Sequence, residues 1–184
     1  MSLQHTLLGF LNYGSMTGYE LKQTMDVSTA NFWYAKQSQI YMTLKKMEEK
    51  GLVFSDVEAQ DGRPDRRVYT ITDAGRAALD NWLAQPVMEL QPKKELVLLK
   101  LFFSSRKNKE AILTQLRLQR DLHQNRLEHF EGETASVIRQ FATGLSEMAK
   151  DALLWDATRQ YGVMYSKMSI QWLDETIAMI DENF

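Results

Sequence analysis

The chain has 184 residues, of which 44% are hydrophobic and 25% charged; these values exclude wholesale disorder and predict one domain or two small ones. No apolar run reaches the roughly 18 to 20 residues of a bilayer span, and the first ten residues do not resemble a secretion signal, so we expect a cytoplasmic protein without a membrane partner. The formal charge of −2 is divided evenly between the two halves of the chain, which excludes attachment to nucleic acid by bulk charge alone.

The first fifty residues predict three helices. Leucines recur between residues 3 and 11 at the spacing of one helical face, which indicates the first helix. Thr17 and Glu20 fit a capping box, in which each side chain binds the backbone amide group of the other residue, so a second helix begins there. A third helix is expected over about 36–50, ended by Gly51. Its inward face carries Ile40, Leu44 and Met47.

A hairpin and a fourth helix follow. The β-compatible runs at 52–58 and 66–72 are joined by a segment, 59–65, that contains Asp-Gly and Pro, the residues of a turn. Thr72 is then placed to cap a helix that ends before Pro86. Three helices, a hairpin and a further helix in this order predict a winged helix-turn-helix.

The second half contains only helical patterns. A short apolar helix is expected over 94–103. From about 108 to 150, apolar side chains alternate three and four residues apart, which is a coiled-coil register with a bend expected near Gly132 or Gly144. Such a helix would be about 60 Å long and therefore needs a partner. A last helix, over about 151–181, is apolar around a wide arc and should be covered on several sides.

Enzyme and metal signatures are missing from the sequence. Zero cysteines exclude disulfides, thiolate nucleophiles and cysteine-bound zinc. The three histidines, His5, His123 and His129, are too scattered to predict a metal site. No nucleophile elbow, phosphate-binding glycine loop or zinc-protease motif occurs, so we expect neither catalysis nor a cofactor.

Several stretches in the first half follow one another in a characteristic order. They are Leu7-Leu8-Gly9-Phe10-Leu11, Gly18-Tyr19-Glu20-Leu21, Gln39-Ile40-Tyr41, Gly51-Leu52-Val53 and Val68-Tyr69-Thr70-Ile71-Thr72. In this order they resemble the PadR family of bacterial transcriptional regulators. Residues 95–103 and the pair Trp172-Leu173 are similar to the longer PadR subgroup, which has an added helical dimerisation domain. The resemblance implies a homodimeric DNA-binding repressor, often relieved by a small aromatic or lipophilic effector.

The expected protein is mainly α with a small β-hairpin wing. A winged helix-turn-helix DNA-binding domain occupies residues 1–88, and a helical domain for dimerisation and effector binding occupies residues 89–184. We expect a homodimer that binds a pseudo-palindromic site in double-stranded DNA. The alternative is an adaptor that uses the winged helix for protein contacts. DNA binding predicts that Tyr41, Lys45 and Arg66 share one convex face repeated across the dimer, whereas an adaptor does not need that alignment.

The outward face of the third helix and the wing supply the candidate DNA contacts. On the helix they are Ser38, Gln39, Tyr41, Met42, Lys45 and Lys46. Hydroxyl and amide groups near a helix start can read base edges, and lysines can contact phosphates or bases. In the wing they are Arg63, Arg66 and Arg67, whose guanidinium groups suit phosphate. The structural alternative pairs these arginines with Asp61 and Asp65 as surface ion pairs.

Four aromatic side chains are candidates for effector binding. They are Trp33, Trp155, Tyr161 and Tyr165. Aromatic residues at helical spacing more often fill a core or a dimer seam. Buried tryptophan and tyrosine nevertheless need partners for their polar groups, and a planar ligand near Trp155 would supply them. Both interpretations stay open at this point.

Overall fold

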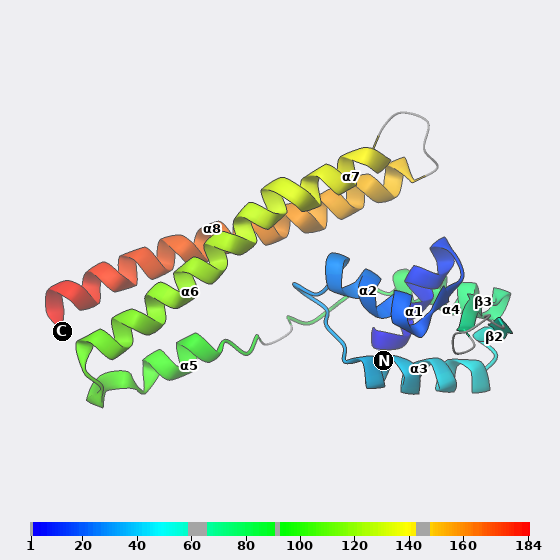
Figure 1. Cartoon of the computed structure of the whole chain (residues 1–184), viewed down its shortest axis with the longest axis horizontal. Coiled ribbons are helices and arrows are strands. Elements are labelled where there is room, and N and C mark those ends of the chain that lie inside the picture. Colours follow the sequence, from blue (N-terminus) through cyan, green and yellow to red (C-terminus); the bar gives the residue numbers. More distant parts are fainter. Residues whose placement is uncertain (1, 59–65, 91–92, 143–147) are drawn as a thin grey trace. The chain divides into compact units, whose positions relative to one another are not determined.

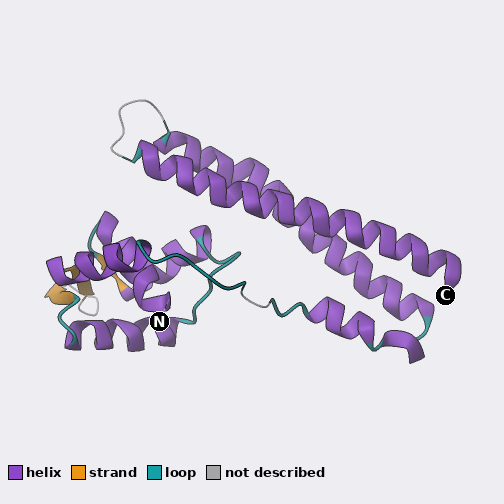
Figure 2. Ribbon diagram, turned by 180° about the vertical axis from the view of Figure 1, so that it is seen from behind, coloured by secondary structure: helices purple, strands orange, loops and turns teal. Residues whose placement is uncertain are grey.

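The computed structural model describes residues 2–58, 66–90, 93–142 and 148–184. The chain forms two compact units, Met1–Gln91 and Pro92–Phe184, here named the N-terminal unit and the helical unit. The sequence predicted a division at 88/89. The predicted fold class, mainly α with a small wing, is confirmed (Figure 2).

Within its described residues, the N-terminal unit contains four helices and a small sheet (Figure 1). In chain order its elements are α1 Ser2–Tyr13, β1 Met16–Thr17, α2 Gly18–Ser28, α3 Gln37–Glu49, β2 Val53–Glu58, β3 Arg66–Ile71 and α4 Asp73–Leu83. The sheet is antiparallel in the order β1-β3-β2, and Val53 of β2 lies opposite Ile71 of β3. The first strand, β1, was not predicted, because two residues are too few to show alternation.

Local signals set the ends of these helices as expected. The Glu20 amide donates to the Thr17 hydroxyl at 3.1 Å, and the Thr17 amide donates to the Glu20 carboxylate at 2.8 Å, so the predicted capping box is present. The Thr72 hydroxyl likewise accepts from the Gly75 amide at 3.1 Å at the start of α4. Gly51, just after α3, has a φ of +68°, which glycine adopts without steric cost.

One apolar cluster holds the N-terminal unit together. It joins α1, α2, α3, α4 and the sheet. Its fully buried members include Leu7, Leu8, Leu21, Ile40, Leu44 and Met47. Because the inward face of α3 is fixed in this core, its opposite face is directed to solvent.

The helical unit is built on two long antiparallel helices. In chain order its described elements are α5 Leu96–Phe102, a short 3-10 turn Ser104–Arg106, α6 Lys109–His129, a π-helical turn Phe130–Thr134, α7 Ala135–Phe141 and α8 Ala149–Asn183. Helices α6 and α8 lie side by side (Figures 1 and 2). Arg120 of α6 donates to Asp174 of α8 at 2.5 Å, and Lys167 of α8 lies 2.7 Å from Glu131, so the helices run in opposite directions.

The helix predicted over about 108–150 is shorter in the structure and is interrupted. It ends at Phe141, and a π-helical turn that contains Gly132 interrupts it; the other expected bend, Gly144, lies outside the described residues. Leu113 and Leu116 of α6 pack in one cluster with Leu173 of α8. The partner that the apolar seam of α6 requires is therefore α8 of the same chain. The heptad pattern alone does not distinguish a helix that pairs within its own chain from one that pairs with a second chain.

Candidate nucleic-acid interface

Helix α3 separates two kinds of side chain. All six predicted contact residues of this helix are exposed, and they lie opposite the buried Ile40, Leu44 and Met47. The exposed residues are Ser38, Gln39, Tyr41, Met42, Lys45 and Lys46. The geometry is that of a helix held by its inner face, with hydroxyl, amide, thioether and ammonium groups available on its outer face.

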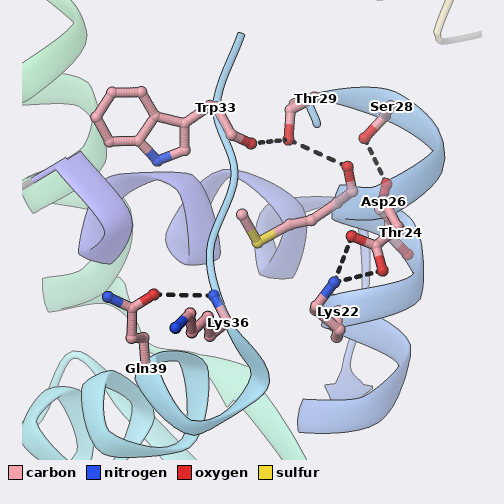
Figure 3. Close-up of polar contacts among 9 residues, drawn as sticks. Lys22, Thr24, Asp26, Ser28, Thr29, Trp33, Lys36 and Gln39 are labelled. Carbon is pink, nitrogen blue, oxygen red and sulfur yellow. Dashed lines mark hydrogen bonds and ion pairs between the residues drawn. The ribbon is translucent and has the colours of Figure 1, made fainter. Parts of the chain in front are cut away.

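The connector between α2 and α3 is fixed by short polar contacts (Figure 3). The Lys36 amide donates to the Gln39 side-chain carbonyl at 2.8 Å, which satisfies one unpaired amide at the start of α3. The Thr29 hydroxyl donates to the Trp33 carbonyl at 3.2 Å at the other end of the connector. Capping therefore uses one lone pair of the Gln39 side-chain carbonyl, and the side-chain NH2 group can donate to a base.

A shallow concavity of about 460 Å³ opens beside the outer face of α3. It is lined by Tyr41, Lys45, Glu48, Glu49, Arg67 and Tyr69. Tyr41 and Lys45 thus share a surface with a wing arginine, which is Arg67. Arg66, the arginine expected to share their face, is not among the lining residues.

The described wing arginines pair with carboxylates of the helices. Arg66 donates to Glu20 of α2 at 2.6 Å, and Arg67 donates to Glu48 of α3 at 2.7 Å. The predicted Arg63 and the two aspartates expected as partners lie outside the described residues. Sequence reasoning missed both glutamates, since each lies at least 19 residues from its arginine.

Both glutamates are held ionised by hydrogen bonds. The Thr17 amide, with further help from its hydroxyl and from Arg66, holds the pKa of Glu20 below its usual value. The Ser55 hydroxyl and then Arg67 lower the pKa of Glu48 in the same way. The positive charge of each arginine is therefore partly compensated before any ligand arrives.

The aromatic candidates for effector binding are divided between the two units. Trp33 lies exposed on the connector of the N-terminal unit. Trp155 of α8 packs edge-on against Phe141, with ring centroids 5.6 Å apart. Tyr161 and Tyr165 stack on one another at 6.4 Å further along α8. Within the helical unit, the two tyrosines are brought together.

The tyrosine pair is completed by two residues that precede α5. Lys93 donates to the Tyr161 hydroxyl at 2.6 Å, and its ammonium lies 4.5 Å from the centre of the Tyr165 ring. Tyr165 donates to Glu95 at 2.5 Å; burial, together with this carboxylate, raises the pKa of Tyr165 to about 12. Lys93 and Glu95 were not predicted, because 68 and 70 residues separate them from their partners.

A second concavity, of about 590 Å³, lies between α5 and α6, and none of the four aromatic candidates lines it. Its lining is Leu99, Lys100, Phe103, Ser104, Lys107, Ala111, Ile112 and Gln115. In the part of the chain that the structure describes, no three His, Asp or Glu side chains come together in a way that could hold a metal. No described helix has the length and apolarity to cross a membrane.

Two helices, α2 and α3, that pack on one another, expose the outer face of α3 and are followed by a small antiparallel wing are the arrangement of winged-helix transcriptional regulators. Comparison with known proteins agrees. The model of the transcriptional regulator PadR-like family matches residues 7–81, and that of the virulence activator alpha C-terminal family matches residues 93–181. The chain belongs to the PadR-like family of transcriptional regulators, in its longer subgroup.

Similar proteins cover nearly the whole chain. The "Probable transcriptional regulator Rv1176c" of Mycobacterium tuberculosis is 32% identical over 196 residues, with 99% of each chain covered. The "Negative transcriptional regulator PadR" of Bacillus subtilis is 28% identical over 187 residues, with 98% of each covered. The crystal structure of the Bacillus subtilis protein with operator DNA has a TM-score of 0.80 at 24% identity, and covers 98% of this chain and 99% of that one. Its structure with p-coumaric acid has a TM-score of 0.72 at 25% identity, with the same coverage.

Proposed function

We propose that the protein is a homodimeric repressor that binds a pseudo-palindromic site in duplex DNA and acts in the cytoplasm. The observation that carries the proposal is the outer face of α3, where six polar, basic and amphipathic side chains are exposed above a fully buried inner face. The name of the Bacillus subtilis relative, a negative regulator, and its complex with operator DNA support the same role.

The residues of this surface have different roles in the proposal. Ser38 and the side-chain amide of Gln39, at the start of α3, read base edges in the major groove. Met42 makes apolar contact with a base. Tyr41, with Lys45 and Lys46, contacts phosphates or bases. The wing arginines, Arg63, Arg66 and Arg67, contact the DNA backbone, since guanidinium geometry suits phosphate.

The exposed apolar surface of the helical unit supports the proposed dimer. Helix α5 leaves large side chains in solvent, and Phe102 is 82% exposed. The others on this helix and just after it are Leu96, Leu98, Leu99 and Phe103. A second copy of the chain covers this surface in the proposed dimer. Because a two-fold axis relates the two α3 helices, the preferred DNA site is a pseudo-palindrome.

The effector is a small aromatic compound, and the site that fits it best is the tyrosine pair with Lys93. Stacked rings suit a planar ligand, and the Lys93 ammonium suits a carboxylate. The Bacillus subtilis relative has been solved with p-coumaric acid, a compound of this kind. Trp33 and Trp155 are the other candidates. A ligand lowers DNA affinity if it binds more tightly to a dimer geometry that does not fit DNA than to the one that does. The size of the effect is set by the difference between its affinities for the two geometries.

Selection from random duplex DNA with the full-length protein tests the proposal. The expected result is an enriched pseudo-palindrome. Lys45→Ala should weaken binding to it about tenfold and reduce the salt slope by about one, whereas Lys150→Ala, an exposed lysine of the helical unit, should change neither. If no symmetric sequence is enriched, the adaptor interpretation replaces this one.

A further inference from the structure

A closed ring of hydrogen bonds lies beside the outer face of α3. Arg67 donates through Nη2 to Glu48 Oε2 at 2.7 Å and through Nε to Ser55 Oγ at 2.8 Å. The Ser55 hydroxyl donates to Glu48 Oε1 at 2.6 Å. The three side chains come from β3, α3 and β2, so the ring joins the wing to the exposed helix.

The ring occupies one edge of the Arg67 guanidinium group, and no described residue forms a hydrogen bond at another edge. A planar guanidinium group has five N–H donors, and the ring takes one from Nε and one from Nη2. Two N–H groups of Nη1 and one of Nη2 remain, and one N–H from each nitrogen forms the edge that faces away from Nε. The Arg67 side chain is 54% exposed. The edge that faces away from Nε has the fork geometry that binds two phosphate oxygens at once.

The position of this edge connects it with α3. Arg67 lines the same concavity as Tyr41 and Lys45, between the exposed helix and the wing. The guanidinium carbon also lies 5.6 Å from the centre of the Tyr69 ring, which limits its movement on a further side. An arginine held at three points loses little side-chain entropy when it binds a ligand.

We propose that Glu48 and Ser55 are positioning residues that hold Arg67 with its free edge directed at a DNA phosphate. This inference rests on the proposed function and adds a specific role for an acidic residue at the DNA surface.

Two effects of Glu48 on DNA binding oppose one another. Its charge repels DNA, so simple electrostatics predicts that removing the charge strengthens binding. Positioning predicts the reverse, because an arginine released from the ring samples many conformations.

A matched pair of glutamates separates the two effects. Glu49 lines the same concavity as Glu48, and no ion pair or hydrogen bond is found for its side chain among the described residues. Glu48→Gln and Glu49→Gln therefore remove the same charge from the same surface, but only the first opens the ring. Ser55→Ala opens the ring without any change of charge.

The experiment measures the affinity of the full-length variants for a 30-base-pair duplex enriched by selection. We expect Arg67→Ala to weaken binding about tenfold, Glu48→Gln and Ser55→Ala about three- to fivefold, and Glu49→Gln to strengthen it slightly. In the Arg67→Ala background, Glu48→Gln should no longer weaken binding. A neutral methylphosphonate is then placed at each backbone position of the duplex in turn. At one position it should weaken DNA binding by the wild type and by Glu49→Gln. At the same position it should weaken binding by Arg67→Ala and Glu48→Gln much less.

The outcomes distinguish this inference from the proposed function. If Lys45→Ala weakens binding while Arg67→Ala does not, the role of Arg67 is wrong and the DNA surface on α3 stands. If Glu48→Gln strengthens binding as Glu49→Gln does, Glu48 only compensates charge. If the wild-type chain enriches no duplex, the proposed function itself fails. Because Ser55→Ala keeps every charge, its weakened binding at unchanged thermal midpoint supports positioning independently.

Discussion

The ring of Tyr41 lies against Gly18, so closely that a Cβ atom at position 18 would be 2.5 Å from Cε1 of the ring. Gly18 is the first residue of α2, and Tyr41 lies on α3, so this contact sets how closely the two helices approach. The Tyr41 ring is also 44% exposed and belongs to the candidate DNA surface. One glycine therefore connects the packing of the helix pair with the position of a residue proposed to bind DNA.

Gly18→Ala should displace the Tyr41 ring, destabilise the protein by about 1–3 kcal/mol and weaken DNA binding. Gly9→Ala is the matched control, because Gly9 lies within α1 and a Cβ there would meet nothing within 4 Å. The control should stabilise the protein by about 0.5–1 kcal/mol, since alanine costs less backbone entropy than glycine in a helix. Urea unfolding measures both variants. Equal stability of the two would contradict the close contact.

Gly162→Ala should destabilise the helical unit more severely. A Cβ at this position would lie 2.6 Å from the ring of Phe130, and this ring is buried and has less freedom to move outward than that of Tyr41. We expect a loss of about 2–4 kcal/mol in the free energy of unfolding. Gly132→Ala, where a Cβ would meet nothing within 4 Å, is the control. A Gly162→Ala variant as stable as the control would disprove close packing of α8 on Phe130.

Stability should fall as the pH decreases through about 6.5. Burial and the nearby charge of Arg126 lower the pKa of His123, although Glu95 acts in the opposite direction, and Tyr165 contacts the imidazole ring edge-on. The unfolded chain therefore binds a proton more readily than the folded chain, and the free energy of unfolding rises with pH across this range. Below the pKa of His123 in the folded chain, the whole of this contribution to the free energy of unfolding is lost.

Unfolding experiments between pH 5 and pH 8 check this effect. The part of the slope of the unfolding free energy against pH that is due to His123 should stay below about 1.4 kcal/mol per pH unit, because the ring is only partly buried. His123→Gln should remove that part of the slope. His129→Gln is a useful comparison, since this exposed histidine pairs with Glu133 at 3.2 Å. If both variants keep the wild-type pH profile, His123 does not contribute to the pH dependence of stability.

The full-length chain should be a dimer at micromolar concentration, and a chain truncated at residue 90 should be a monomer. Phe102→Glu should dissociate the dimer, because it places a charge on the apolar surface of α5. Leu90→Glu is the control, since Leu90 is fully exposed and precedes the helical unit. Light scattering with sedimentation velocity distinguishes the species. A monomeric wild-type chain would refute the dimer.

Lys93→Ala should weaken the binding of p-coumarate at least fivefold, because the ammonium that suits its carboxylate is lost. Lys94→Ala, next in the chain and exposed, should bind it as the wild type does. Tryptophan fluorescence and release of DNA are followed in the same titration. If no compound alters either signal while Trp155→Ala is clearly destabilised, the aromatic residues fill a core or a dimer seam instead.

Local signals in the sequence predicted much of this fold, and distant contacts account for what they missed. The caps at Thr17 and Thr72 and the end of α3 at Gly51 depend on residues a few positions apart, so they were predicted correctly. The pairing of Arg66 with Glu20 and of Lys93 with Tyr161 depends on how distant segments meet. Composition and periodicity do not contain that information.

The π-helical turn Phe130–Thr134 adds one residue to a turn, so the side chains of α7 are rotated by about 100° from the course of α6. Leu127 and Phe130, before and at this turn, are buried, whereas Val137 after it is 47% exposed. In evolutionary terms, we expect one inserted or deleted codon within this turn to change the face that α7 presents, while α6 keeps its pairing with α8. Relatives that differ by one residue here should therefore show different side chains at the tip of the helical unit.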